Sequence, residues 1–508
     1  MNNLIIGTII YFIILSVIIA FAVFNFAKRN TNIVYLFSIF VSWFFGFFTI
    51  IFLPLDIALA SDETYNNEKL TTFWKSVYWI TFFLSWIILP LILEFYNSGR
   101  ITVFERIIDS LKRNLKFYAI ISTIVIIGLC LIIAISNINI YNLGSLLISL
   151  SNTYGIIIIM ILISDGFIEF PKFFWNYCDF EHRIKLLAFT YDIIEQDYFD
   201  ANNNLIHAIL NIKKHKLTKN YEDDIKKLMI DNVYIKLLPY VININFIEGQ
   251  LENELKDNEL NMIINNYKTN IDTYEIAKLK LNSCLKSFNY LNTLSYSYLK
   301  KKLYDVIFKL ISIILSICSI ITFWCELCIT IKNSGIDLSL YSFAINYTNN
   351  IIWKYLFSSV TLLYLGVALY YPLFRSKIYN IFSKLLYLPE LQTNHKSTIP
   401  MLLNVSIFMC RLQFSLSFNF LSMIKYTHSN VNTGYMISLG HNLVLSPFDS
   451  YTPIIMIILI FMKLFKITDK ILSYFDIDYC SEPVANNLDH ENKIIQNMEL
   501  LKKMKLIE

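Results

Sequence analysis

The chain has 508 residues, of which 56% are hydrophobic and only 16% are charged, and its mean hydropathy is +0.50. A soluble protein usually carries about 25% charged residues, so we expect much of this surface to face lipid rather than water. The formal net charge of +4 is small and its basic residues are scattered, which argues against a nucleic-acid partner.

Nine apolar stretches are long enough to cross a bilayer, because a hydrocarbon core of about 30 Å needs roughly 20 helical residues. They lie at 4–27, 33–57, 74–95, 117–136, 145–169, 305–329, 353–374, 399–424 and 452–470. The first stretch is too long for a cleavable signal peptide and no basic residues precede it, so we expect a retained helix. The sequence therefore predicts an all-α polytopic membrane protein with about nine transmembrane helices.

Lys and Arg in the short loops indicate the orientation of these helices. They concentrate after the first, third and seventh predicted spans, at Lys28, Arg29, Arg100, Arg106, Lys112, Arg113, Lys116, Arg375, Lys377, Lys384 and Lys396. The alternate loops carry few, at Lys69, Lys332 and Lys425. Because positive loops stay in the cytoplasm, we expect an outside or lumenal N-terminus and a cytoplasmic C-terminus. The plasma membrane and endolysosomal membranes both fit these helix lengths.

The hydropathy pattern divides the chain into four regions. Membrane helices occupy 1–171 and 304–470, a helical insert occupies 172–303, and a tail occupies 471–508. The loop charges place both the insert and the tail in the cytoplasm. In the tail, Ile495, Met498 and Leu501 predict a weak amphipathic stripe.

Two stretches of the insert keep a seven-residue apolar repeat, which is typical of long helices that pair as a coiled-coil hairpin. The first repeat consists of Ile184, Tyr191, Tyr198 and Leu205 with Leu187, Ile194, Ala201 and Ala208. The second consists of Tyr274, Leu281, Phe288 and Ser295 with Ala277, Cys284, Leu291 and Tyr298. The middle, 212–270, is polar and predicts shorter helices and loops. A structural stalk and a docking surface for a cytosolic protein, over residues 190–295, are both open interpretations.

Charged residues inside the spans are candidates for function, because a charge in the bilayer is costly. Arg411 lies near the middle of a span and should point into the bundle, toward a carboxylate or backbone carbonyls. Its candidate partners are Asp165, Glu169 and Glu326. Asp165 and Glu169 share one helix face, where they could hold a cation, relay a proton or simply pair with nearby loops. Glu326 and Asp56 lie near outer span ends and could reach water.

Catalytic and metal-binding motifs are missing from the sequence. It has no phosphate-binding Gly-rich loop, no HExxH and no GxSxG, so we expect no enzyme activity, cofactor or metal. Cys325 and Cys328 form a CxxC without further ligands nearby, which favours packing over metal binding. Pro54 and Pro90 would kink or end their helices and free carbonyls that must be satisfied inside the protein. Broken helices occur at transport sites, but no inverted repeat relates the two halves of the chain.

Several segments in succession resemble the LMBR-type family, the limb region and lipocalin-interacting membrane receptors. These are Ile51–Ile57, Val77–Trp79, Leu84–Pro90, Asn152–Gly155, Gly166–Pro171, Phe174–Asn176, Trp324–Glu326, Phe374–Arg375, Cys410–Leu412 and Asn419–Leu421. They contain Pro54, Asp56, Trp79, Trp86, Pro90, Gly155, Pro171 and Trp324. The order and spacing resemble especially the branch called LMBR domain-containing protein two. The resemblance implies nine membrane helices with an outside N-terminus, and family positions at Asp56, Glu169, Trp324, Glu326 and Arg411.

Members of the wider family are associated with lipocalin uptake, lysosomal cobalamin export and G-protein-coupled receptor signalling, so the resemblance does not select one function. We expect a non-enzymatic receptor or adaptor that couples an extracellular or lumenal ligand, or a membrane partner, to cytosolic proteins. The alternative is a transporter, or an obligate transporter subunit, with a cavity lined by Arg411 and the carboxylates of Asp165, Glu169 and Glu326. An internal arginine suits a small anionic ligand. Asn346 begins a glycosylation sequon on the predicted outer side.

Overall fold

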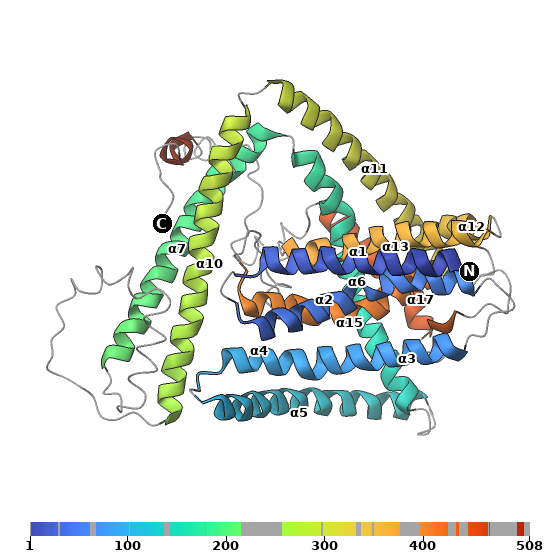
Figure 1. The fold of residues 1–508 in the computed structure, drawn as a ribbon, viewed down its shortest axis with the longest axis horizontal. Coiled ribbons are helices and arrows are strands. Elements are labelled where there is room, and N and C mark those ends of the chain that lie inside the picture. Colours follow the sequence, from blue (N-terminus) through green and yellow to red (C-terminus); the bar gives the residue numbers. More distant parts are fainter. Residues whose placement is uncertain are drawn as a thin grey trace. The chain divides into compact units, whose positions relative to one another are not determined.

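The structure, a computed structural model, describes residues 2–28, 31–60, 68–100, 102–136, 143–177, 179–214, 257–295, 298–331, 337–347, 350–375, 397–424, 433–435, 446–465, 467 and 495–501. These residues form helices and no strand (Figure 1). The helices are α1 (Asn2–Phe26), α2 (Ile33–Leu59), α3 (Glu68–Phe83), the π-helical segment η1 (Leu84–Ile88), α4 (Leu89–Asn97), α5 (Val103–Ser136), α6 (Leu143–Tyr177), α7 (Phe180–Lys214), α10 (Asp257–Ser295), α11 (Tyr298–Ile331), α12 (Leu340–Asn346), α13 (Ile351–Arg375), α15 (Ile399–Met423) and α17 (Ser446–Leu464). The predicted all-α class is confirmed.

The chain divides into two compact units. The bundle unit comprises Met1–Pro90, Ile124–Asp179 and Leu299–Tyr479. The hairpin unit comprises Leu91–Thr123, Phe180–Tyr298 and Cys480–Glu508. The sequence predicted a separate insert and tail. The hairpin unit contains 180–298 of the predicted insert and 480–508 of the predicted tail, and adds to them the end of α4 and the part of α5 up to Thr123.

Six helical stretches of the described residues are long and apolar enough to cross a membrane: Ile9–Phe26, Ile33–Leu59, Glu68–Asn97, Asp305–Ile331, Ile351–Phe374 and Ile399–Met423. They correspond to six of the nine predicted spans. The other three predicted spans, 117–136, 145–169 and 452–470, fall in α5, α6 and α17. In α17, Pro453–Leu464 is a shorter apolar helix. The count of nine therefore stays a prediction.

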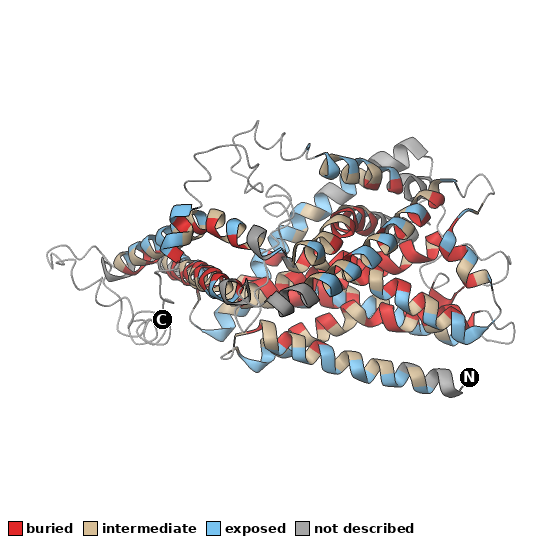
Figure 2. Cartoon of the chain, turned by 90° about the horizontal axis from the view of Figure 1, so that it is seen from above, coloured by how far each residue is buried: buried red, intermediate tan, exposed pale blue. Residues whose placement is uncertain are grey.

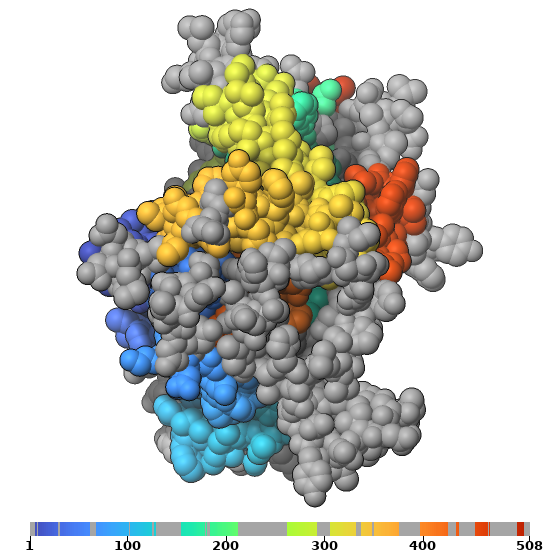
Figure 3. Space-filling model, turned by 90° about the vertical axis from the view of Figure 1, so that its right-hand side faces the viewer, coloured from blue at the N-terminus to red at the C-terminus, as the bar shows by residue number. Residues whose placement is uncertain are grey.

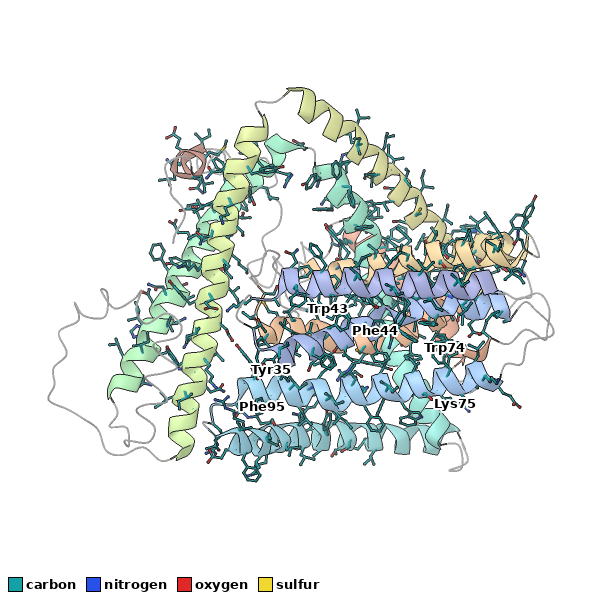
Figure 4. The ribbon with its side chains drawn as sticks, viewed as in Figure 1. Tyr35, Trp43, Phe44, Trp74, Lys75 and Phe95 are labelled. Atoms are coloured by element: carbon teal, nitrogen blue, oxygen red, sulfur yellow. The ribbon has the colours of Figure 1, made fainter. Side chains whose placement is uncertain are left out.

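The centre of the bundle unit is formed by α2 and α15, which pack side by side. Trp43 of α2 donates from its Nε1 to Ser406 Oγ of α15 at 2.9 Å, and Cys410 Sγ of α15 donates to Ser42 O of α2 at 3.2 Å. Trp43 and Trp74, labelled in Figure 4, are both buried. By contrast, α1 is mostly pale blue and tan in Figure 2, because its apolar side chains are exposed. An exposed apolar helix fits a lipid-facing position.

Two glycines of α6 allow neighbouring helices to approach closely. A Cβ at Gly155 would collide with the Ser415 side chain of α15, and one at Gly166 would collide with the Ala368 carbonyl of α13. Small residues serve this purpose in membrane helix packing. In Figure 3, α12 and α13 form a golden band across one face, next to the orange-red α17.

In the hairpin unit, α7 and α10 run antiparallel and bury the two predicted repeats between them (Figure 1). One cluster joins Leu205 and Ile209 to Ile264 and Ile271, and a second joins Ile184 and Ala188 to Leu281 and Phe288. Fourteen members of the predicted repeats are buried in or packed against these clusters, namely Ile184, Leu187, Tyr191, Ile194, Tyr198, Ala201, Leu205, Ala208, Tyr274, Ala277, Leu281, Cys284, Phe288 and Leu291. The side chains of the other two, Ser295 and Tyr298, lie outside the described part of the structure. Much of the predicted polar middle, 215–256, lies outside the described residues.

Residues 495–501 of the tail form a helical segment, which docks on the second cluster. Leu501 is buried there and Met498 packs against it, while Asn497 Nδ2 donates to Ala188 O at 2.9 Å. Ile495 is 56% exposed. The predicted stripe was therefore wrong in one member, because the buried face contains Asn497 in place of Ile495.

Candidate functional site

The candidate site begins at a local change of helix type in the third span. Leu89 N donates to Leu84 O, five residues back, so η1 is a π-helical turn. In an α-helix the same N–H would donate to Ser85 O. Residue 90 is a proline without an N–H, so it cannot donate to Ser85 either. The Ser85 carbonyl is thereby released from its own helix, as π-helical turns at functional sites often allow.

Arg411 of α15 donates a hydrogen bond to the released Ser85 carbonyl. Its Nη2 donates to Ser85 O at 3.2 Å, and its guanidinium carbon lies 4.0 Å from the centre of the Trp86 ring. Both contacts stabilise a positive charge, since the carbonyl oxygen and the ring face are each electron-rich. The arrangement can hold an arginine at this depth and presents a permanent cation beside an aromatic ring.

The carboxylates expected to pair with Arg411 lie elsewhere, so that part of the prediction was wrong. Asp165 Oδ1 forms an ion pair with Lys463 Nζ of α17, and Glu169 Oε1 lies 3.4 Å from the same ammonium. The two carboxylates do share one helix face, as predicted. Their cation is Lys463, which the sequence signals only as a basic residue in the last turn of the last span.

Glu326 and Asp56 are both completely buried, so the prediction that they could reach water was wrong. Glu326 Oε1 accepts a hydrogen bond from Asn419 Nδ2 at 2.5 Å. Among the described residues, its Oε2 has no hydrogen-bond partner. Gln413 of α15 is also buried, and neither its Oε1 nor its Nε2 has a partner in the described chain.

Asp56 fixes a short segment that follows α15. Its Oδ2 accepts from Trp74 Nε1 at 2.9 Å and from Tyr435 N at 2.8 Å, and its Oδ1 accepts from Gly434 N at 3.1 Å. Tyr435 OH donates to Phe414 O at 2.5 Å, and the Tyr435 and Phe414 rings stack 5.7 Å apart. A carboxylate with three N–H donors can stay charged when buried. Sequence reasoning found Asp56 but missed Trp74 and Tyr435.

The prolines of the predicted set differ in their effects. Pro54 lies inside α2, which continues to Leu59, so it does not end the helix. Pro171 lies inside α6 and frees the Phe167 carbonyl four residues earlier. Ser319 Oγ of α11 donates to Phe167 O at 3.1 Å, and Ser312 Oγ donates to Pro171 O at 2.8 Å. A freed carbonyl thus again receives a donor from a neighbouring helix.

The remaining predicted residues lie apart from Arg411. Trp79 is 51% exposed, and Trp324 is 46% exposed and donates from its Nε1 to Leu338 O at 3.2 Å. Asn346 ends α12, where its Nδ2 lies 3.4 Å from Ser342 Oγ. Cys325 and Cys328 are buried and free of disulfides. In the ranges that the structure describes, no group of three or more His, Cys, Asp or Glu residues could hold a metal.

The sequence as a whole was compared with known proteins. Its similarity to a human G-protein coupled receptor-associated protein LMBRD2 is 22% identity over 460 residues, 79% of this chain and 64% of the relative. An LMBR1 domain-containing protein 2 homolog A from Dictyostelium discoideum is 21% identical over 471 residues, 82% of this chain and 62% of the relative. A G-protein coupled receptor-associated protein LMBRD2 from Caenorhabditis briggsae is 26% identical over 207 residues, 35% of this chain and 32% of the relative.

The chain therefore covers less than two thirds of the length of each of these three relatives. No solved structure matches it. The profile of one family, described as LMBR1-like membrane protein, matches residues 4–468. Because that match covers nearly all of the bundle unit and the whole insert, the chain belongs to the LMBR1-like membrane protein family.

Proposed function

We propose that this membrane protein is a non-enzymatic receptor or adaptor, which couples a ligand or membrane partner to cytosolic proteins through its hairpin unit. The observation that carries the proposal is the helix docked on α7 and α10. Residues 495–501 show that this surface binds a helix, since Leu501 enters the cluster around Tyr191, Leu281 and Phe288. A surface that binds one helix within its own chain has the chemistry to bind another from a partner.

The hairpin also exposes apolar side chains outside its seam. Phe199 is 54% exposed and Met262 is 77% exposed, and Ile193 and Tyr290 are likewise exposed. Aromatic residues and methionine are enriched in protein interfaces. Their position on two long helices supports a docking surface over a plain stalk.

The names of the relatives support a membrane partner. The human and Xenopus laevis relatives carry the name G-protein coupled receptor-associated protein. We extend that association to this chain and propose a seven-helix receptor as its partner in the membrane. Placing the hairpin in the cytoplasm rests on the loop charges. Protease protection should find residues 190–295 and the C-terminus on the same side.

The test is a pull-down with the full chain in detergent, in which Phe199→Ser and Met262→Ser are combined. We expect cytosolic partners to be lost while the protein stays folded, since both side chains are exposed. Asn204→Ser, at an exposed polar position of α7, is the matched control and should retain them. If the apolar variant captured the same partners as the control, the hairpin would not be the docking surface.

A second candidate, a transporter or obligate transporter subunit, is favoured by Arg411 alone. A permanent cation beside Trp86 suits a small anionic ligand. The candidate predicts that Arg411→Leu abolishes uptake of such a ligand into reconstituted vesicles, with Arg411→Lys partly restoring it. Unchanged flux in the leucine variant would remove its support.

A further inference from the structure

The connection between α4 and α5 is built around two cations that rest on backbone carbonyls. Lys268 of α10 donates from its Nζ to Ser98 O at 2.7 Å, and Arg106 of α5 donates from its Nε to Arg100 O at 2.6 Å. All four residues belong to the hairpin unit, and both cationic side chains are half-buried. A carbonyl carries only a partial charge, so these contacts position the cations without neutralising them.

Two carboxylates near the connection are committed to other groups, and a third, Asp272 of α10, acts on Lys268 through its charge. Asp109 Oδ2 accepts from Ser98 Oγ at 2.9 Å and lies 3.1 Å from Arg113 Nη2. Glu94 of α4 lies 3.7 Å from Arg113 Nη1. Within the described parts of the chain, neither Arg106 nor Lys268 forms an ion pair. The two cations therefore leave the connection with positive charge that is not neutralised by an ion pair within the described residues.

The electrostatics of Lys268 agree with this geometry. Burial and, to a lesser extent, the charge of Arg106 together lower the pKa of its ammonium to about 8, with the charge of Asp272 partly opposing them. Two like charges close enough to interact raise the free energy of the folded chain. An anion between them would remove that cost and raise the pKa of Lys268 again.

The position along the chain indicates where the anion comes from. The apolar span Glu68–Asn97 ends just before the connection, which places it at the edge of a membrane. The first turns of α5 expose Phe104, Ile107 and Leu111, whose spacing of three and four puts them on one helix face. Exposed apolar residues beside basic ones are typical of helices at the lipid headgroup level.

We propose that Arg106 and Lys268 bind the phosphate group of an anionic phospholipid, whose acyl chains lie along Phe104, Ile107 and Leu111. The guanidinium fork of Arg106 matches phosphate oxygens, and the ammonium of Lys268 supplies a point charge from the other side. The ligand bridges α5 and α10. The site is independent of the proposed adaptor function.

The test is a titration of the full chain, purified in delipidating detergent, with short-chain phosphatidylglycerol and, separately, with phosphatidylcholine and inorganic phosphate. We expect saturable binding of phosphatidylglycerol alone. Arg106→Gln and Lys268→Gln should each weaken it about tenfold, the effect of losing one charged hydrogen bond. Lys268→Arg should retain binding and so exclude misfolding. Lys112→Gln, at an exposed lysine of the same helix, is the matched control and should leave the affinity unchanged.

Four results would overturn the proposal. They are binding that does not saturate, an equal loss in Lys112→Gln, equal affinity for phosphatidylcholine, and equal affinity for inorganic phosphate. Binding that does not saturate, or an equal loss in Lys112→Gln, would indicate diffuse attraction to a basic loop. Equal affinity for phosphatidylcholine would indicate apolar contact alone, and equal affinity for inorganic phosphate would indicate a site for free phosphate.

A pH series separates the contributions of the two cations. The affinity of the native chain for phosphatidylglycerol should fall as pH rises through about 8, while the affinity of Lys268→Arg should not.

Discussion

Several helices of the bundle unit are joined by side chains that donate hydrogen bonds to backbone carbonyls of their neighbours. By contrast, α7 and α10 of the hairpin unit meet mainly through a repeating apolar seam, with one such contact from Cys284 Sγ to Leu187 O. In the bundle, such donors come from Arg411, Ser319, Ser312, Tyr370, Cys410 and Tyr435. In the hairpin, the clusters consist almost entirely of apolar and aromatic side chains. Lipid tails give apolar side chains little reason to associate, while water does. The two units therefore show how the solvent selects the means of helix association.

The largest expected effect is on the stability of the apolar seam between α7 and α10. Phe288 is buried in the second cluster, and Phe288→Ala should cost about 3–5 kcal/mol because it removes a large side chain and leaves a cavity. Hydrogen exchange on the full chain in detergent would show faster exchange in α7 and α10. Phe199→Ala, at an exposed phenylalanine of α7, should change little. Equal loss of protection in the bundle unit would show that the two units do not stabilise themselves separately.

The next effect tests a charged anchor of the bundle. Asp56→Asn should cost about 3 kcal/mol, because the amide replaces one of the acceptors that hold Trp74, Gly434 and Tyr435. Thermal unfolding in detergent would measure the cost. Glu68→Gln, at an exposed carboxylate of α3, should stay within about 0.5 kcal/mol. Similar melting temperatures for the two variants would contradict the role of Asp56.

A smaller effect on stability is expected from Arg411, and it should depend on Pro90. Arg411→Met should cost about 2 kcal/mol, since it leaves the Ser85 carbonyl without its donor. Pro90→Ala restores an N–H and lets the helix satisfy that carbonyl itself. In a double-mutant cycle, the two changes should therefore couple by about 1 kcal/mol. Strictly additive costs would contradict the release of Ser85 by Pro90.

The smallest effect concerns the docked tail. Asn497→Ala removes the hydrogen bond to Ala188 O and should weaken docking by about 1 kcal/mol. Cys284 lies in the same cluster, and burial raises the pKa of its thiol to about 11. Its labelling by a thiol reagent should become about fivefold faster in the variant. Gln496→Ala, at an exposed position, serves as the control, and an unchanged rate in both would place Cys284 outside the influence of the tail.

Prediction from sequence succeeded where periodicity carries the information. The seam residues of α7 and α10 repeat every seven residues, and six apolar spans coincide with helices that could cross a membrane. Arg411 was found because a charge in an apolar run is rare, and backbone carbonyls were among its expected partners.

Prediction failed where a contact depends on which helices become neighbours. Nothing local in the sequence pairs Lys463 with Asp165, or Asn419 with Glu326, because each pair joins two helices far apart in the chain. The hydrogen bond of Ser85 was hidden for another reason. Pro90 predicts that a backbone carbonyl is freed, but the sequence does not indicate which donor will bind to it.

The preference of the bundle for carbonyl acceptors has a consequence for how such a sequence can drift. A carbonyl belongs to the main chain, so a mutation at Ser85, Phe167 or Phe414 can change the side chain and leave the acceptor in place. Mutational loss is therefore confined to the donor and, at Ser85 and Phe167, to the proline that frees the carbonyl. Two descendants could share such contacts while differing at the acceptor residues, and co-variation would link the donor to the proline rather than to the acceptor.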